Sequence, residues 1–147
     1  MPVSKINFFA DGVNYTLKSK KTIREWLANS AKTEGYIIKE LSYIFCSDDA
    51  LLEINQAFLN HDTLTDIITF DNSEKKNEII GEIYISIERI QENAEKYKTE
   101  TSQELRRVMI HGVMHLCGYK DKSTTDKSIM KNKEDEYLGT ISLYKVQ

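Results

Sequence analysis

Two of the three histidines in this sequence, His111 and His115, are four positions apart. In a helix this spacing places both imidazole rings on one side, one turn apart, where they can bind the same metal ion. A third donor is expected after Gly118, because a glycine at a helix end allows the backbone to reverse and brings Asp121 toward the rings. We therefore predict that His111, His115 and Asp121 are metal ligands and catalytic residues.

Two imidazoles and one carboxylate are typical of catalytic zinc sites and of non-haem iron sites, and both leave coordination positions open for water or substrate. The peptidase pattern of this type has a glutamate directly after the first histidine, where this chain has Gly112, so peptide hydrolysis by that route is not expected. Gly112 either leaves room for a substrate or allows close helix packing. A histidine pair can also be incidental, and His61, followed by Asp62, is an alternative third ligand.

The two histidines belong to a well-marked helix. Residues 101–104, Thr-Ser-Gln-Glu, form a predicted capping box at its start, and Gly118 is its predicted end. Its apolar face consists of residues at helical spacing, namely Leu105, Val108, Met109, Gly112 and Leu116. Glu104 lies seven positions before His111 and is a candidate to orient a ligand ring.

The other elements are predicted from apolar periodicity and turn residues. We expect a hairpin around Asp11-Gly12, strands at 36–46, 66–70 and 78–85, and helices at 22–35, after 47–49, after Ser86 and at 125–138. In the last helix the predicted packed positions are Ile129, Met130, Tyr137 and Leu138. Strands and helices do not alternate strictly as in repeated βαβ units, so we predict an α+β fold. In this fold helices pack on a mixed sheet of about four strands, and the metal site lies at the end of a central helix.

The composition predicts a single domain over residues 1–147. No apolar stretch approaches the roughly 20 residues needed to cross a bilayer, and the start lacks the pattern of a signal peptide, so we expect a cytoplasmic protein without membrane contact. Cys46 and Cys117 are expected to be free thiols. The net charge of −3 argues against binding nucleic acid by bulk electrostatics, so DNA is not expected and RNA must meet a local basic patch.

Residues 111–119, HGVMHLCGY, resemble the signature of the YbeY family of metal-dependent ribosomal RNA maturation endonucleases. Residues 64–70 and 81–86 agree with it in order and spacing, so the resemblance covers about residues 40 to 121. It implies an α+β fold with one divalent metal ion, zinc, and cleavage of single-stranded RNA at the 3′ end of 16S rRNA. It also implies a role in ribosome quality control, with the small ribosomal subunit and an Era-type GTPase as partners.

The sequence departs from the family pattern at two positions. Asp121 stands where the family usually has a third histidine, and its negative charge should make a metal-bound water less acidic. Leu59 stands where the family usually has an arginine, which removes a cation that can stabilise phosphate charge. Lys120 is a candidate to replace that cation, and we predict Thr65, Asp66 and Lys120 as substrate-binding residues.

Two other classes of function remain open. The chain can be a ribosome-associated binding factor whose metal is mainly structural, and the absence of the arginine favours this alternative. It can also be a metallopeptidase-like hydrolase or an iron oxygenase, although the missing glutamate argues against a peptidase.

Overall fold

The computed structural model describes residues 5–59 and 65–144, except for the side chain of Leu59. Its strands are β1 (Lys5–Ala10), β2 (Ile37–Cys46), β3 (Ile67–Asp71) and β4 (Glu78–Ser86). They form a sheet in the order β1-β2-β4-β3, in which β2 is parallel to β1 and β4, and β3 is antiparallel to β4. This mixed sheet confirms the predicted α+β class.

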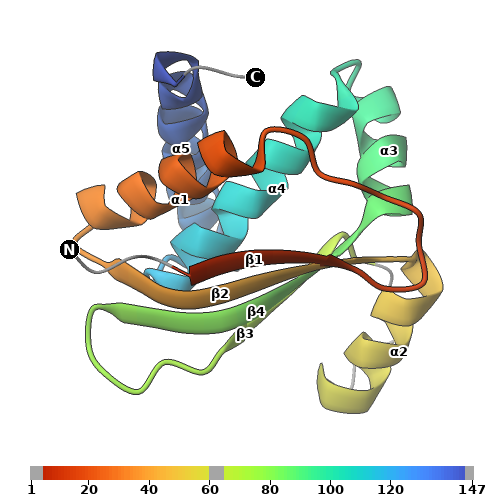
Figure 1. Cartoon of the computed structure of the whole chain (residues 1–147), viewed down its shortest axis with the longest axis horizontal. Helices are drawn as coiled ribbons and strands as arrows, with labels where there is room; N and C mark the ends of the chain where they lie inside the picture. The colour runs from red at the N-terminus through yellow and green to blue at the C-terminus, as the bar shows by residue number, and fades with distance from the viewer. Residues whose placement is uncertain (1–4, 60–64, 145–147) are drawn as a thin grey trace.

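The helices are α1 (Lys20–Thr33), α2 (Asp48–Leu59), α3 (Ile87–Lys96), α4 (Thr101–Leu116) and α5 (Thr124–Thr140), followed by a short 3-10 helix, Ile141–Leu143. Figure 1 shows α1, α3, α4 and α5 on one side of the sheet and α2 on the other side, at one end. In the described ranges, none of the helices combines the length and the apolar character needed to cross a lipid bilayer.

The predicted hairpin around Asp11-Gly12 is wrong. β1 pairs with β2 in parallel along its whole length, and residues 13–17 form no strand. The chain instead runs along the core toward α1, where Leu17 is buried and the ring of Tyr15 contacts Phe45 edge-on, with 5.1 Å between centroids. The alternation of apolar residues therefore reflects packing of an extended segment and not strand pairing.

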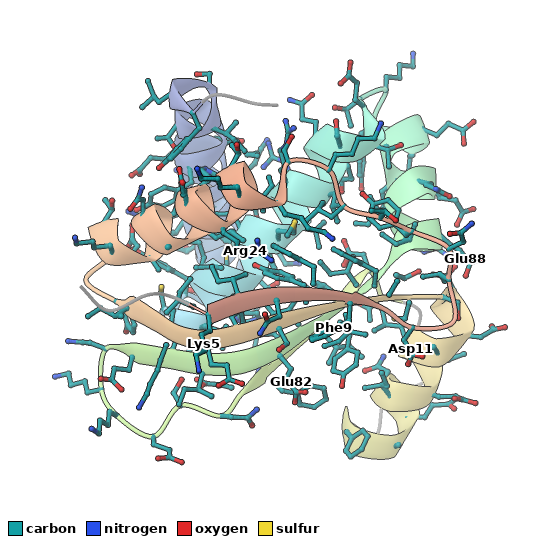
Figure 2. All side chains as sticks on the ribbon, in the orientation of Figure 1. Lys5, Phe9, Asp11, Arg24, Glu82 and Glu88 are labelled. Atoms are coloured by element: carbon teal, nitrogen blue, oxygen red, sulfur yellow. The ribbon has the colours of Figure 1, made fainter. Side chains whose placement is uncertain are left out.

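The main core lies between the sheet and helices α1 and α4. Trp26 and Leu27 of α1 are fully buried there, as are Tyr43 of β2 and Met109 of α4. The hydroxyl of Tyr43 donates a hydrogen bond of 3.0 Å to the carbonyl of Met109, which fastens α4 to the sheet. Side chains on the opposite face, such as Phe9 and Glu82, project away from α1 and α4 (Figure 2).

The start of α4 differs from the prediction. The N-cap is Glu100, and no side chain caps this end, so the predicted capping box from Thr101 to Glu104 is wrong. Glu104 is one position too far along the helix to reach the amide of the N-cap residue. Its side chain is buried, and it becomes available to the cavities beside the histidines.

The end of α4 is as predicted. Gly118 has a φ of +98°, a conformation that favours glycine, and its amide donates to the carbonyl of His115. The amide of Tyr119 donates to the carbonyl of Met114, so two carbonyls at the helix end are satisfied while the chain turns back. This reversal places Asp121 beside the last turn of α4.

Candidate metal centre

The structure brings His111, His115 and Asp121 together. The distance from His111 Nε2 to Asp121 Oδ2 is 3.3 Å, and that from His115 Nε2 to Asp121 Oδ1 is 3.8 Å. One ligand atom from each of the three residues lies within 4.8 Å of the other two. The side chains predicted to bind the metal therefore form a compact group that can hold one ion.

Gly112 allows the helix to lie close to the sheet. A Cβ atom at this position would lie 2.6 Å from Cδ1 of Ile83, a fully buried residue of β4, and 3.3 Å from Cδ1 of Ile67. The missing side chain thus faces the core, while His111 faces the cavity. Of the two interpretations open from the sequence, the structure supports close packing.

The second ring nitrogen of His111 contacts α5. His111 Nδ1 lies 2.7 Å from Oε2 of Glu134, a buried carboxylate whose Oε1 accepts a hydrogen bond of 2.9 Å from Arg107. Arg107 also pairs with Asp135 at 2.7 Å. Because a carboxylate accepts, Nδ1 carries the hydrogen, and in the neutral ring Nε2 presents a lone pair to Asp121.

His115 is oriented by the chain that follows it. Its Nδ1 donates to the carbonyl of Tyr119 at 3.0 Å, so Nε2 of the neutral ring again presents a lone pair to Asp121. The hydroxyl of Tyr119 donates to Glu34 at the end of α1, at 2.6 Å. Lys133 and Tyr137 of α5 donate to the same carboxylate. The loop that carries Asp121 is therefore fastened to α1 and α5.

These hydrogen bonds produce a site that requires a cation. Two imidazole lone pairs and a carboxylate face one another, an arrangement that is repulsive unless a proton or a metal ion lies between them. Burial disfavours the charged form of His111, but the hydrogen bond and charge of Glu134, with the charges of Asp121 and Asp66, outweigh it and raise its pKa. The donor set fits a catalytic zinc site with an open position.

The candidate ligands line a cavity of about 400 Å³, here called the strand-side cavity because β3 forms its other wall. Thr65 and Asp66, two predicted substrate-binding residues, line it. Burial raises the pKa of Asp66, and the nearby Glu134 adds to this, whereas His111 and Arg89 oppose it. Lys120 is exposed and does not line this cavity, so its predicted substrate contact remains a prediction.

The sequence interpretation missed Glu134 and Arg107. Glu134 lies four residues after Met130 and three before Tyr137, both buried, so a charged residue on the buried face of α5 was the available signal. The same helix corrects one predicted core position, because Ile129 is 44% exposed. α5 is turned so that Met130, Glu134 and Tyr137 face inward.

Several residues named from the sequence lie outside the described residues. They are His61, the alternative third ligand, with Asp62 and Leu64. The side chain of Leu59 is likewise outside the description. The position of Asp121 beside both imidazole rings supports Asp121 as the third ligand.

Comparison with known proteins extends the resemblance beyond residues 40 to 121. The family model described as endoribonuclease YbeY matches residues 6–142. The chain is similar to a Cytophaga hutchinsonii protein named endoribonuclease YbeY, with 51% identity over 139 residues, covering 95% of this chain and 97% of that protein. A Flavobacterium psychrophilum protein of the same name is 51% identical over 126 residues, covering 86% of this chain and 89% of that protein.

A solution structure of a Thermotoga maritima protein has a similar fold, with a TM-score of 0.64 and 30% sequence identity. The likeness covers 92% of this chain and 88% of that one. Residues 6–142, which the family model matches, include α4, α5 and nearly the whole sheet, and these elements together build the candidate metal centre. The chain belongs to the endoribonuclease YbeY family.

Proposed function

We propose that the protein is a metal-dependent endoribonuclease that hydrolyses phosphodiester bonds in single-stranded RNA. His111, His115 and Asp121 would hold one divalent ion, most simply zinc, and a bound ion would supply Lewis-acid polarisation of a water molecule and of the phosphate oxygens. The observation that carries the proposal is the convergence of two imidazole lone pairs and one carboxylate at the strand-side cavity. The name shared by the relatives supports RNA as the substrate.

The carboxyl groups beside the ligands are suited to proton transfer. Asp66 and Glu104 both line the strand-side cavity, and burial raises the pKa of each. The charge of Asp66 raises the pKa of Glu104 further, while Arg107 lowers it. A carboxyl with a raised pKa can accept a proton from the attacking water and return it to the leaving oxygen near neutral pH. We assign this role to Asp66, and Thr65 beside it contributes to substrate binding.

Arg107 supplies positive charge near the proposed phosphate position. Among the described residues that line the strand-side cavity, it is the one with a permanent positive charge. Its terminal nitrogens are paired with Glu134 and Asp135, so it contributes through its field and not through an unoccupied pair of donors. It is therefore a better candidate than the exposed Lys120 to replace the arginine that the family usually has at position 59.

The biological step follows from the family resemblance. We propose that the protein acts in the cytoplasm on the small ribosomal subunit, matures the 3′ end of 16S rRNA and contributes to ribosome quality control with an Era-type GTPase. Lys120, Thr65 and Asp66 then contact the RNA precursor. The convergence of His111, His115 and Asp121 supports hydrolysis, and the choice of rRNA rests on the family resemblance.

The test uses protein that has been stripped of metal and reloaded with zinc, manganese, nickel or iron. The zinc-loaded protein should cleave a single-stranded rRNA precursor and leave a duplex of the same sequence intact, while His111→Ala should be inactive although folded by circular dichroism. Equal cleavage by His111→Ala would reject the proposal and indicate another site or a contaminating nuclease.

A second candidate function is a ribosome-associated binding factor with a mainly structural metal. The replacement of the family arginine by Leu59 favours it, because a cation that stabilises phosphate charge is absent from that position. Normal rRNA processing in cells that carry His111→Ala would support this alternative over the enzyme.

A further inference from the structure

A second cavity, of about 620 Å³, meets the strand-side cavity at the candidate metal centre. The two cavities share five lining residues, namely Glu104, Arg107, His111, Asp121 and Glu134. We call it the helix-side cavity, because the end of α3, the start of α4 and the α5 helix form its walls. A linear polymer bound at the metal centre can therefore extend into both cavities.

The outer walls of the two cavities differ in chemistry. Beyond the shared residues, the strand-side cavity is lined by residues 65–69 and by Val108 and His115 of α4, and these described residues include no lysine or arginine. The helix-side cavity is lined by an aromatic ring, two lysines and polar or flexible side chains, namely Tyr97, Lys127, Lys131, Thr99, Gln103 and Met130. Among the described lining residues, the combination of added lysine charge with an aromatic ring therefore occurs in the helix-side cavity.

The two lysines are available to an anionic ligand. Lys127 and Lys131 are one turn apart on α5, so both side chains extend on the same side of the helix. Both side chains are exposed, and within the described residues neither ammonium group forms an ion pair or a hydrogen bond, whereas the ammonium of Lys133 on the same helix is paired with Glu34. Because the net charge of the chain is −3, RNA binding depends on a local group of cations, and this lysine pair supplies one beside the candidate metal centre.

Tyr97 presents an aromatic ring at the rim of this cavity. It caps the C-terminal end of α3, and the residue is 62% exposed. The ammonium of Lys96 lies 5.6 Å from the ring centroid, which adds a further positive charge beside it. Exposed aromatic rings next to basic side chains are the usual surface on which proteins stack unpaired bases.

We propose that the helix-side cavity binds the nucleotide next to the cleaved phosphodiester, with its base stacked on Tyr97 and its phosphate held by Lys127 and Lys131. This inference rests on the proposed endoribonuclease function and adds a substrate subsite to it. It agrees with the single-strand specificity proposed above, because a base that is paired and stacked in a duplex does not expose a face to Tyr97. Asp66 and the strand-side cavity then receive the other side of the cleaved bond.

The test measures binding and cleavage separately on the full-length, zinc-loaded protein. Fluorescence anisotropy with a nuclease-resistant, single-stranded 2′-O-methyl phosphorothioate oligonucleotide reports affinity. Tyr97→Leu should weaken binding roughly tenfold, whereas Tyr97→Phe, which keeps the ring, should bind like the wild type. The double variant Lys127→Gln/Lys131→Gln should lower the slope of log affinity against log salt by about 1.4, or about 0.7 for each lost cation.

Matched controls lie outside both cavities. Phe9→Leu removes an exposed ring from the opposite face of the sheet (Figure 2), and Lys75→Gln/Lys76→Gln removes two exposed lysines from the β3–β4 loop. Both should bind the oligonucleotide like the wild type. The proposal is overturned if the wild type does not bind, if Tyr97→Leu binds normally, if Tyr97→Phe loses as much as Tyr97→Leu, or if the control lysine pair changes the salt slope equally.

The binding result can be separated from the proposed catalytic function. If His111→Ala cleaves like the wild type, the metal-dependent function fails, but the loss of binding in Tyr97→Leu still supports a nucleotide subsite. If His111→Ala is inactive while Tyr97 and the two lysines have no effect on binding, the catalytic proposal stands and the subsite is rejected.

Discussion

The two histidines of α4 present the same atom to the same carboxylate but are held in different ways. His111 is 19% exposed and donates through Nδ1 to a buried carboxylate from α5, whereas His115 is 40% exposed and donates to a main-chain carbonyl four residues later. A carboxylate behind an imidazole raises its basicity as a ligand, while a carbonyl mainly fixes its orientation. His111 is thus supported by a charge network and His115 by local chain geometry.

The largest expected effect comes from removing each ring. His111→Ala should lower zinc affinity by more than about 100-fold, because it removes a ligand and leaves Glu134 buried without its imidazole partner. His115→Ala should lower zinc affinity by a several-fold smaller factor, since water can enter the more exposed position of His115. Competition with a chromophoric chelator measures both affinities. Equal losses, or a larger loss for His115→Ala, would contradict the difference drawn between the two rings.

The charge network behind His111 is tested next. Glu134→Gln should lower zinc affinity by roughly 10- to 100-fold, because the amide is a weaker partner for Nδ1–H than the carboxylate. Asp135→Asn is the matched control, since Asp135 also pairs with Arg107 but has no contact with His111. If both variants lose the same affinity, Arg107 and not the imidazole mediates the effect.

The same contact makes the metal-free protein sensitive to pH. The pKa of folded His111 is raised above its ordinary value of 6.5, so its stabilising contribution is complete below about that pH. The contribution is lost as the pH rises through the higher folded value. Urea unfolding in the presence of a chelator should therefore give a lower free energy of unfolding at pH 8 than at pH 6. Glu134→Gln should reduce this difference between pH 8 and pH 6. An unchanged difference would contradict the role of Glu134 in raising the pKa of His111.

The smallest effect is expected on the His115 side. Tyr119→Phe removes the hydrogen bond to Glu34 that fastens the loop, so zinc affinity should fall a few-fold and stability by about 1 kcal/mol. Tyr137→Phe is the matched control, because Tyr137 donates to the same carboxylate but lies outside the metal loop. Thermal unfolding should show that Tyr137→Phe loses about as much stability as Tyr119→Phe, while its zinc affinity is unchanged. A similar loss of affinity in both variants would show that Glu34 acts only through general stability.

Local spacing predicted the parts of the centre that lie on one short segment. The histidine pair, the stop at Gly118 and the return of Asp121 all depend on one helix end, so the sequence contains their geometry. Glu134 depends on how α5 packs against α4, 23 positions from His111, which periodicity alone does not specify. The resemblance seen in the sequence covers about residues 40 to 121, whereas the family model matches residues 6–142 and so includes α5 and Glu134.

The errors have the same physical origin. Apolar alternation around Asp11-Gly12 is compatible with a hairpin or with an extended segment on the core, and the parallel pairing of β1 with β2 decides between them. The start of α4 was predicted one residue late, which assigned Glu104 to a cap when it is buried beside the cavities. A glycine at position 112 is compatible with an open site or with close packing, and the contact with Ile83 of β4 decides for close packing.

The identity of the third ligand is the most direct test of the candidate metal centre. Metal analysis by mass spectrometry, with X-ray absorption on the zinc-loaded protein, should show one ion per chain bound to two imidazoles and one carboxylate. Asp121→Ala should lose the metal and His61→Ala should keep it. Retained metal in Asp121→Ala together with its loss in His61→Ala would contradict the assignment.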